Sequence, residues 1–403
     1  MNDFIRRSLL LVLIVAAGCN GSSSSSTPAA TPAAPAPTPV PTPADANFLS
    51  IAVNAQPYGS VNTPTASVTV CQPGTSNCQT INGVLIDTGS VGLRIFSSAL
   101  AVPLQQQEVN GKPIGECEVF LAGPTWGPIG LADLQMGNQP KISSMPVQII
   151  ADSNFAPEPA DCANRSIQPA QTDPAVAGFN GILGVGPLPQ DCGNFCASMP
   201  TNEYYSCTSA SPAGTCTPTA QAVGDQVPNP VALLPVDNNG VVVELPQLSS
   251  NGAPSASGFL LFGIGTESDN QLGSATVLTL NSSLSINVTY KGASLPDSFI
   301  DSGSQAFFFR DSSIPACHDS TTYCPSSLLK LSAVATGQNG NSSTINFEIA
   351  TPLSPNFAFN DLGANNHSSD EFDLGLPFFF GRSVFVAIQG AGTPAGPGPY
   401  WAF

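Results

Sequence analysis

Charged residues are scarce in this sequence, and basic residues are the scarcest of them. Lys and Arg together number 10 and Asp and Glu 27 in a chain of 403 residues, so the formal net charge is −17. No basic cluster follows the first few residues, which argues against nucleic acid as a partner. Long helical charge patterns are also missing. Short runs of Val, Ile, Leu and Phe between Gly, Pro, Asn and Ser clusters predict a mostly β chain.

Histidine is nearly absent, and this limits metal and nucleophile chemistry. The two His are His318 and His367, and no Cys-x-x-Cys pair accompanies them, so no zinc site is predicted. No Gly-x-Ser-x-Gly elbow exists for a serine hydrolase, and we expect both His at the surface. Gly181, Gly184 and Gly186 do not follow the strand-to-helix pattern of nucleotide-binding loops. We therefore predict no metal and no cofactor.

The N-terminus has the pattern of a targeting segment. Two arginines precede an apolar run from Leu9 to Ala17, which is too short to span a bilayer as a mature helix. The run ends in Ala-Ala-Gly-Cys at positions 16–19, which resembles a bacterial lipobox with Cys19 as the lipidated residue. Because Asn20 and not Asp follows, the resemblance implies an outer-membrane lipoprotein facing the periplasm or the cell surface. Plain secretion after removal of residues 1–18 is the alternative.

The composition divides the remaining chain into a tether and a globular part. Residues 19–46 are almost entirely Ser, Thr, Pro and Ala, which cannot bury a core, and we expect an extended tether that touches the membrane only through its lipid. The globular part is expected to be a monomer with an N-terminal lobe over residues 47–245 and a C-terminal lobe over residues 246–403.

The cysteine count fits an oxidising compartment. Of the 11 Cys, Cys19 is set aside for lipid, and the even number that remains suits disulfides in a periplasm. Three close pairs predict local bridges, namely Cys71/Cys78, Cys207/Cys216 and Cys317/Cys324. The spacing leaves open how the other four pair, and these are Cys117, Cys162, Cys192 and Cys196.

A faint internal duplication runs through the globular part. In each copy an apolar strand leads into Asp-(Thr/Ser)-Gly-Ser and a second apolar strand follows, with the aspartates at Asp87 and Asp301. Much later each copy has an apolar run that ends in Gly, expected at residues 182–184 in the first copy and 378–381 in the second. One such loop alone would be an ordinary turn, but two with partner runs at similar offsets predict two related lobes.

These features resemble the pepsin-like aspartic peptidases over nearly all of residues 47–403. Further stretches match in the same order, at residues 179–186, 258–263, 381–388 and 399–403. The resemblance implies an all-β fold, a two-lobed pepsin-like double β-barrel with a pseudo-twofold axis and a cleft between the lobes.

The chemistry of this family explains the residue types in the two loops. Two carboxyls about 3 Å apart cannot both ionise, so Asp87 and Asp301 would share one proton and titrate as a unit. A water between them could attack a peptide carbonyl while the protonated partner supplies an acid. The residues that the resemblance assigns to support of this catalytic pair are Thr88, Gly89, Ser90, Ser302, Gly303 and Ser304.

The sequence departs from the family where a β-hairpin flap should close over substrate. The corresponding stretch, residues 118–133, lacks the usual Tyr, and Phe120 and Trp126 are the candidates to replace it. The Trp that usually bonds this Tyr is replaced by Arg94. Both members of the Tyr–Trp pair are therefore missing. The way in which the flap would hold a substrate is thus not predicted by the resemblance.

Three functions remain open from the sequence. The first is an envelope-anchored aspartic endopeptidase that acts on extended peptides or unfolded proteins. The second is a non-catalytic peptide-binding or enzyme-inhibiting module on the same fold, and the third is a structural envelope lipoprotein. Asp370, Glu371 and Asp373 could clamp a cation, but a solvated acidic loop is the preferred interpretation.

Overall fold

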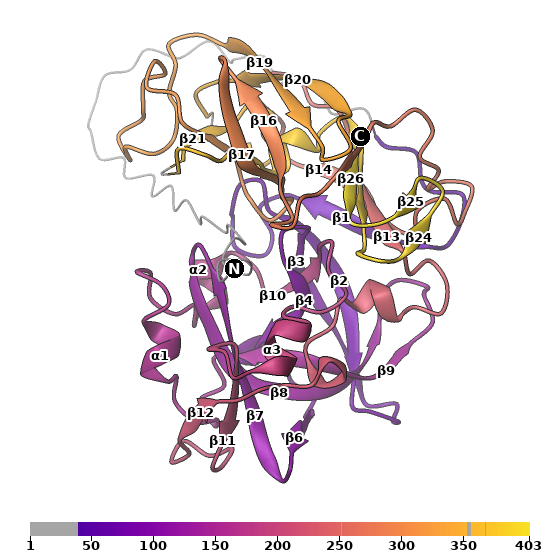
Figure 1. Cartoon of the computed structure of the whole chain (residues 1–403), viewed down its shortest axis with the longest axis vertical. Helices are drawn as coiled ribbons and strands as arrows, with labels where there is room; N and C mark the ends of the chain where they lie inside the picture. The colour runs from indigo at the N-terminus through magenta and orange to yellow at the C-terminus, as the bar shows by residue number, and fades with distance from the viewer. Residues whose placement is uncertain (1–38, 251, 353–355, 367) are drawn as a thin grey trace, which may run out of the picture.

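The computed structural model describes residues 39–250, 252–352, 356–366 and 368–403, which form two lobes stacked along the long axis of the molecule (Figure 1). Several predicted features lie outside these residues: the signal peptide, Cys19, the tether up to residue 38, and His367. Among the described residues, no helix is both long enough and apolar enough to cross a membrane.

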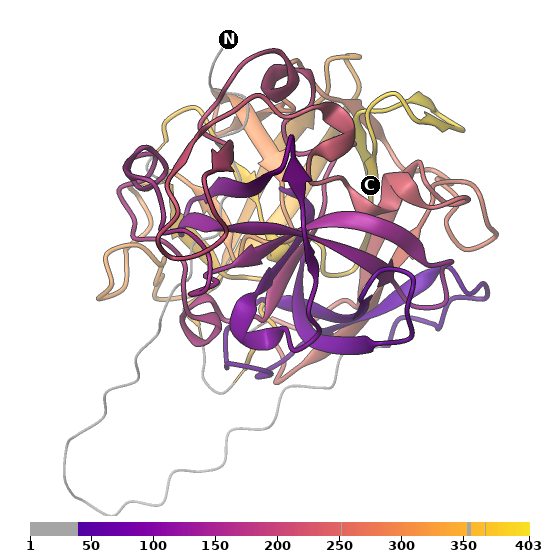
Figure 2. The ribbon, with the colours of Figure 1, turned by 90° about the horizontal axis from the view of Figure 1, so that it is seen from below.

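The first lobe is built almost entirely of strands, which lie in front of the second lobe when the molecule is seen from below (Figure 2). Its strands are β2 (Pro64–Cys71), β3 (Cys78–Asp87), β4 (Val91–Phe96), β5 (Gln105–Gln106), β6 (Glu108–Val109), β7 (Lys112–Phe120), β8 (Gly123–Gln135), β9 (Ile142–Ile150), β10 (Gly181–Val185), β11 (Tyr204–Cys207) and β12 (Cys216–Pro218). Its helical turns are η1 (Ser97–Ala99), α1 (Ala160–Ala163), α2 (Pro174–Ala177), α3 (Asn194–Ser198), η2 (Val223–Asp225) and η3 (Pro230–Leu233).

The second lobe is a smaller sheet of seven strands. These are β16 (Ile286–Tyr290), β17 (Ala293–Ile300), β18 (Phe307–Phe309), β19 (Leu329–Thr336), β20 (Ser342–Ile349), β21 (Gly363–Asn365) and β22 (Asp373–Leu374), and the turn η4 (Leu376–Phe378) follows them. A separate two-stranded hairpin consists of β24 (Gly392–Thr393) and β25 (Gly396–Pro397).

A shared group of strands joins the two lobes. It comprises β1 (Phe48–Val53), β13 (Gly240–Leu245), β14 (Ala256–Phe262), β15 (Val277–Thr279), β23 (Arg382–Ala387) and β26 (Tyr400–Ala402). The N-terminal strand β1 pairs with β14, and β13 pairs with both β14 and β23. The boundary expected after residue 245 therefore falls inside this shared sheet.

Both lobes thread a late strand between two early ones in the same way. In the first lobe β10 pairs parallel to β3 and antiparallel to β4, and β4 pairs parallel to β9. In the second lobe β22 pairs parallel to β17 and antiparallel to β18, and β18 pairs parallel to β21. The internal duplication seen in the sequence is thus a duplication of topology.

The threaded strand of the second lobe is not the one predicted. Residues 378–381 were expected to thread beside Asp301, but β22 does so and ends at Leu374, just before Gly375, whereas Leu376–Phe378 is the turn η4. The prediction followed the longer apolar run, and the real strand carries a charged residue, Asp373, among its apolar neighbours. Phe378, like the other phenylalanines of its run, is buried and belongs to the core.

Five disulfides hold the described residues, and they include all three predicted local bridges. The four cysteines whose pairing the sequence left open form Cys117–Cys162 and Cys192–Cys196. The first of these ties β7 to the helical turn α1, which also contacts β8.

Candidate active site

The first Asp-Thr-Gly-Ser loop, residues 87–90, holds its aspartate from two sides. Asp87 is the last residue of β3, and the chain turns immediately into β4. The Gly89 N–H donates to Asp87 Oδ1 at 2.8 Å, and the Ser90 hydroxyl donates to Asp87 Oδ2 at 2.5 Å. Both carboxyl oxygens are therefore fixed by groups two and three residues further on, which is what a short Asp-Thr-Gly-Ser turn permits.

The second loop repeats this geometry. The Gly303 N–H donates to Asp301 Oδ1 at 2.7 Å, and the Ser304 hydroxyl donates to Asp301 Oδ2 at 3.0 Å. The β17 strand delivers Asp301 as β3 delivers Asp87, and the Asp301 N–H donates to Leu374 O on the threaded strand at 3.1 Å.

The two loops are bonded to each other across the lobes. The Thr88 N–H donates to Ser302 Oγ at 3.1 Å, and the Ser302 N–H donates to Thr88 Oγ1 at 2.9 Å. The Ser302 hydroxyl donates in turn to Ile86 O at 2.7 Å. The structure therefore brings together all eight residues that the sequence assigned to the dyad and its support.

The close approach of the loops explains their glycines. A Cβ on Gly89 would lie 2.6 Å from Asp301 Cγ, and one on Gly303 would lie 2.7 Å from Asp87 Oδ1. Neither contact is sterically possible, so any side chain at these positions would push the carboxyls apart. Glycine is required here for space.

The buried pair holds a proton. Burial raises the pKa of Asp301 well above its usual range, and the neighbouring charge of Asp87, the charge of Asp373 and a hydrogen bond between the Asp87 and Asp301 carboxyls raise it further. The Gly303 N–H acts in the opposite direction. Two carboxyls in contact inside a protein avoid a double negative charge by retaining one proton between them.

A third buried carboxyl, Asp373, lies beside this pair. It occupies the position on β22 that Ile182 occupies on β10, since Asp373 pairs with Phe299 two residues before Asp301. The pKa of Asp373 is well above its usual range, mainly because of burial. The expected solvated acidic loop is therefore wrong for Glu371 and Asp373, which are both buried. A charged residue inside an apolar run was the signal that could have indicated this.

The dyad is closed off in this conformation. Asp87 and Asp301 are both 0% exposed. A cavity of about 90 Å³ adjoins the first loop, where it is lined by Thr88, Gly89 and Ser90, but neither aspartate lines it.

Comparison with known proteins assigns the chain to a family and identifies a solved structure with a similar fold. A model of the family described as "Protein of unknown function (DUF3443)" matches residues 43–403. The chain belongs to this family. No curated protein matches it. The crystal structure of an aspartic proteinase from Irpex lacteus has a TM-score of 0.52 to it, covering 88% of this chain and 96% of that chain at 16% identity. This likeness shows that this DUF3443 member has the pepsin-like fold.

The hairpin of this DUF3443 protein differs from the predicted flap. Strands β7 and β8 form the hairpin expected there, with Phe120 paired to Gly123 beside its tip. Phe120 is buried in an apolar cluster with Phe96 and Phe179, and it does not line the cavity. The residue of this hairpin that lines the cavity is Glu118.

Trp126 does not replace the missing Tyr. Trp126 is paired with Cys117 across the hairpin. Because side chains alternate along a strand, both lie on the face opposite to that of Glu118. There Trp126 is buried, packs against Phe155 and Tyr205, and donates from Nε1 to a backbone carbonyl at 2.8 Å. Its role is to hold the hairpin to the layer outside it.

Arg94 does not contact the aspartate pair. Its guanidinium forms ion pairs with Glu116, Glu118 and Asp191, and its Cζ lies 5.9 Å from the centre of the Phe120 ring. The two departures from the family pattern, Arg94 and Phe120, therefore contact each other. Sequence analysis missed the acidic partners because they come from separate segments of the chain. His318 is exposed, as expected.

Proposed function

We propose that this protein is an aspartic endopeptidase that hydrolyses extended peptides or unfolded proteins. The observation that carries the proposal is the pair of bonded loops with Asp87 and Asp301 in contact and one proton between them. A fold alone would not require this arrangement, because a fold hosts many functions and the site decides among them.

The geometry supports direct attack by a water molecule, with one carboxyl acting as base and the other as acid. A water bound between the carboxyls gives its proton to the ionised member of the pair as it attacks the peptide carbonyl, and the protonated Asp301 donates its proton to the carbonyl oxygen. Asp87 then passes the proton it took from water to the amide nitrogen and the C–N bond breaks. A hydroxyl of the tetrahedral intermediate returns a proton to Asp301, which restores the pair with one proton. No covalent intermediate with the protein is needed.

The test is cleavage of an unfolded, disulfide-free protein between about pH 3 and 7, with new termini identified by mass spectrometry. We expect cleavage that a statine-type inhibitor blocks, because its hydroxyl replaces the attacking water between the carboxyls. If this protein, purified with its five disulfides correctly formed, does not cleave the substrate, the proposal is contradicted.

A non-catalytic binding module is the second candidate, and one observation favours it. Both aspartates are fully buried, as a relic pair sealed by its surroundings would be. Ion pairing of Arg94 with either aspartate would also have favoured it, but Arg94 pairs elsewhere. Cleavage separates the candidates, since a non-catalytic module would not cleave an unfolded protein even where it binds a statine-type peptide.

We further propose that the protein acts as a monomer in the bacterial envelope, anchored through Cys19 to the outer membrane. The five disulfides support an oxidising compartment. Metabolic labelling with a fatty acid tests the anchor: label in the wild type and none in Cys19→Ala is expected, and equal labelling would overturn it.

A further inference from the structure

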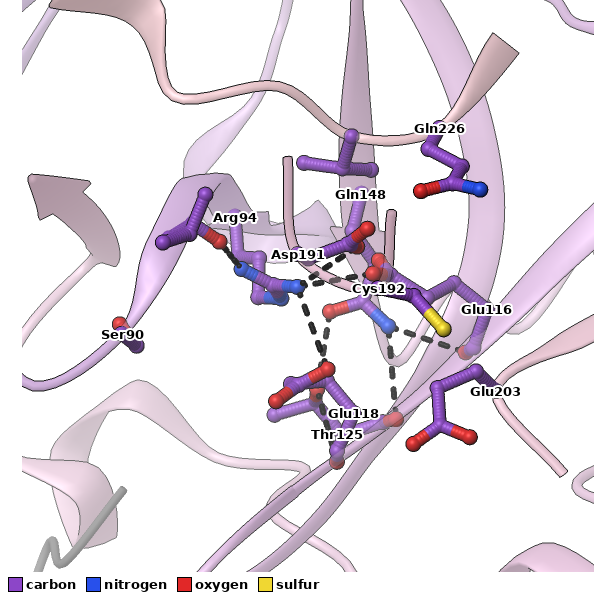
Figure 3. Close-up of polar contacts among 12 residues, drawn as sticks. Ser90, Arg94, Glu116, Glu118, Thr125, Gln148, Asp191, Cys192, Glu203 and Gln226 are labelled. Carbon is purple, nitrogen blue, oxygen red and sulfur yellow. Dashed lines mark hydrogen bonds and ion pairs between the residues drawn. The ribbon is translucent and has the colours of Figure 1, made fainter. Parts of the chain in front are cut away.

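A buried cluster of three acids and one arginine includes two residues of β7, Glu116 and Glu118, together with Asp191 and Arg94 (Figure 3). Arg94 Nη2 lies 2.8 Å from Glu116 Oε1, 3.3 Å from Asp191 Oδ2 and 3.5 Å from Glu118 Oε2. The side chains of Glu118 and Asp191 are 6% and 3% exposed. One guanidinium faces three carboxyls, so the cluster has hydrogen-bond acceptors in excess, and it has negative charge in excess once Glu118 and Asp191 ionise.

Three carboxyl oxygens carry this excess, one on each acid, and two of them belong to residues that line the cavity. Among the described residues, no N–H or O–H group donates a hydrogen bond to Glu118 Oε2 or to Asp191 Oδ1. Buried carboxyl oxygens without a donor are costly and uncommon in folded proteins. A donor from outside the described chain would remove this cost.

Both carboxyls also face the cavity beside the proposed catalytic loop. Glu118 and Asp191 line the same cavity as Ser90. Leu284, between β15 and β16, and Trp401 of β26 also line it. None of the lining residues carries a positive charge. A cavity needs about 10–15 Å³ to hold one water, so 90 Å³ accommodates the end of a long side chain.

The acidic wall is held in place by its neighbours. Asp191 Oδ2 accepts a hydrogen bond from the Tyr204 hydroxyl at 2.6 Å, and the Cys192–Cys196 disulfide follows directly in the chain. Glu118 lies on a paired strand of the hairpin. The two carboxyls are thus preorganised before any ligand arrives, which is a requirement for selective binding.

The geometry favours an organic cation over a metal ion. The Arg94 guanidinium already lies within 3.5 Å of all three carboxyls, so a dication placed among them would be repelled at short range. An ammonium or guanidinium entering from the cavity adds only a single charge and carries several N–H donors. It can donate hydrogen bonds to Glu118 Oε2 and Asp191 Oδ1, which accept none from the described chain, while Arg94 stays in place.

We propose that this cavity is a specificity pocket for a lysine or arginine side chain of the bound peptide, recognised by Glu118 and Asp191. The inference rests on the proposed peptidase function, because that function supplies the peptide in the cleft. It explains why the hairpin presents Glu118 to the cleft where an aromatic residue was expected.

The protonation of the pocket gives the recognition a pH dependence. Burial raises the pKa of Glu118 to about 8, and burial followed by the nearby Glu116 raises the pKa of Asp191. The empty pocket therefore holds protons that a cationic side chain displaces. Preference for lysine should rise as the pH increases from about 5 to 8.

The test measures binding separately from cleavage. Octapeptides with one lysine at each successive position are compared with norleucine counterparts by calorimetry on the wild-type protein. We expect one position where lysine binds about tenfold or more tightly, because its ammonium forms charge-assisted hydrogen bonds with the two carboxyls. Glu118→Gln should reduce this ratio to near one, and the exposed control Glu108→Gln should leave it unchanged.

The outcomes separate the two proposals. Equal binding of lysine and norleucine peptides to the wild type at every position overturns the pocket, even if the peptides are cleaved. A lysine preference without cleavage supports the pocket and counts against the peptidase. Ca²⁺ binding that Glu118→Gln abolishes, with no lysine preference, assigns the cavity to a metal and overturns the inference.

Discussion

Thr88 and Ser302 exchange hydrogen bonds across the two lobes, each side chain accepting from the backbone N–H of the other. Replacing Thr88 by Val leaves the buried Ser302 N–H without its acceptor, and this should lower the free energy of unfolding by about 1–3 kcal/mol. Urea denaturation measures it. Thr80→Val, which removes an exposed hydroxyl pair with Thr69, should change stability by less than about 0.5 kcal/mol. Equal effects of the two variants would contradict the finding that the bonded loops join the lobes.

Asp373 should control the pH range of activity. Once Asp373 ionises, its negative charge raises the pKa of Asp301, so Asp373→Asn, which never carries this charge, should lower the pKa of Asp301 in the alkaline range. The alkaline limb of the pH profile of kcat/KM, where the acid is lost, should then move to lower pH. Asp370→Asn removes an exposed carboxyl nearby and should leave the profile unchanged. A shift to higher pH in Asp373→Asn would contradict this account.

The protein should be more stable in mild acid than at neutral pH. The pKa of Glu118 is about 8 in the folded state, raised from 4.5. Its contribution is complete below about pH 4.5 and is lost as the pH rises through about 8. Because one pKa unit corresponds to about 1.4 kcal/mol, the loss is roughly 3–5 kcal/mol.

The variant Glu118→Gln tests this pH dependence by urea unfolding at several pH values. Its stability should fall less steeply with pH than that of the wild type, because the titrating group is gone. Glu108→Gln, with an exposed side chain, should follow the wild-type slope. Parallel slopes for all three proteins would show that Glu118 is not held protonated.

The long-range disulfide should stabilise more than the hairpin disulfide. Cys117–Cys162 closes a sequence separation of 45 residues and Cys71–Cys78 one of 7. Loop-closure entropy then predicts losses of about 4 and about 2 kcal/mol when each pair is replaced by alanine. Guanidinium unfolding of the two double variants measures the difference. A larger loss for the Cys71–Cys78 variant would contradict this ranking.

The sequence predicted the parts of the fold that are local. Each Asp-(Thr/Ser)-Gly-Ser turn forms its bonds within four residues, so its motif is visible in a short stretch such as Asp87 to Ser90. The second threaded strand was predicted wrongly because Asp373 interrupts its apolar pattern, whereas the run that begins at Phe378 is uninterrupted.

The acidic cavity wall could not be predicted in this way. Arg94, Glu116 and Asp191 come from β4, β7 and the segment after β10, and only tertiary packing brings them together. The departures noted in the sequence did point to the region, since Arg94 replaces an aromatic residue there. The sequence did not predict that Arg94 would pair with carboxyls other than those of Asp87 and Asp301.

The central claim is that Asp87 and Asp301 form a working catalytic pair. Its most direct test is the rate of cleavage of an unfolded protein by the wild type, Asp87→Asn, Asp301→Asn and the control Asp370→Asn, each checked for intact disulfides. Loss of one dyad carboxyl should reduce the rate by about 10²–10⁴-fold or more, while the control keeps wild-type activity. Cleavage at the wild-type rate by either dyad variant, or no cleavage by the wild type at any pH, would contradict the account.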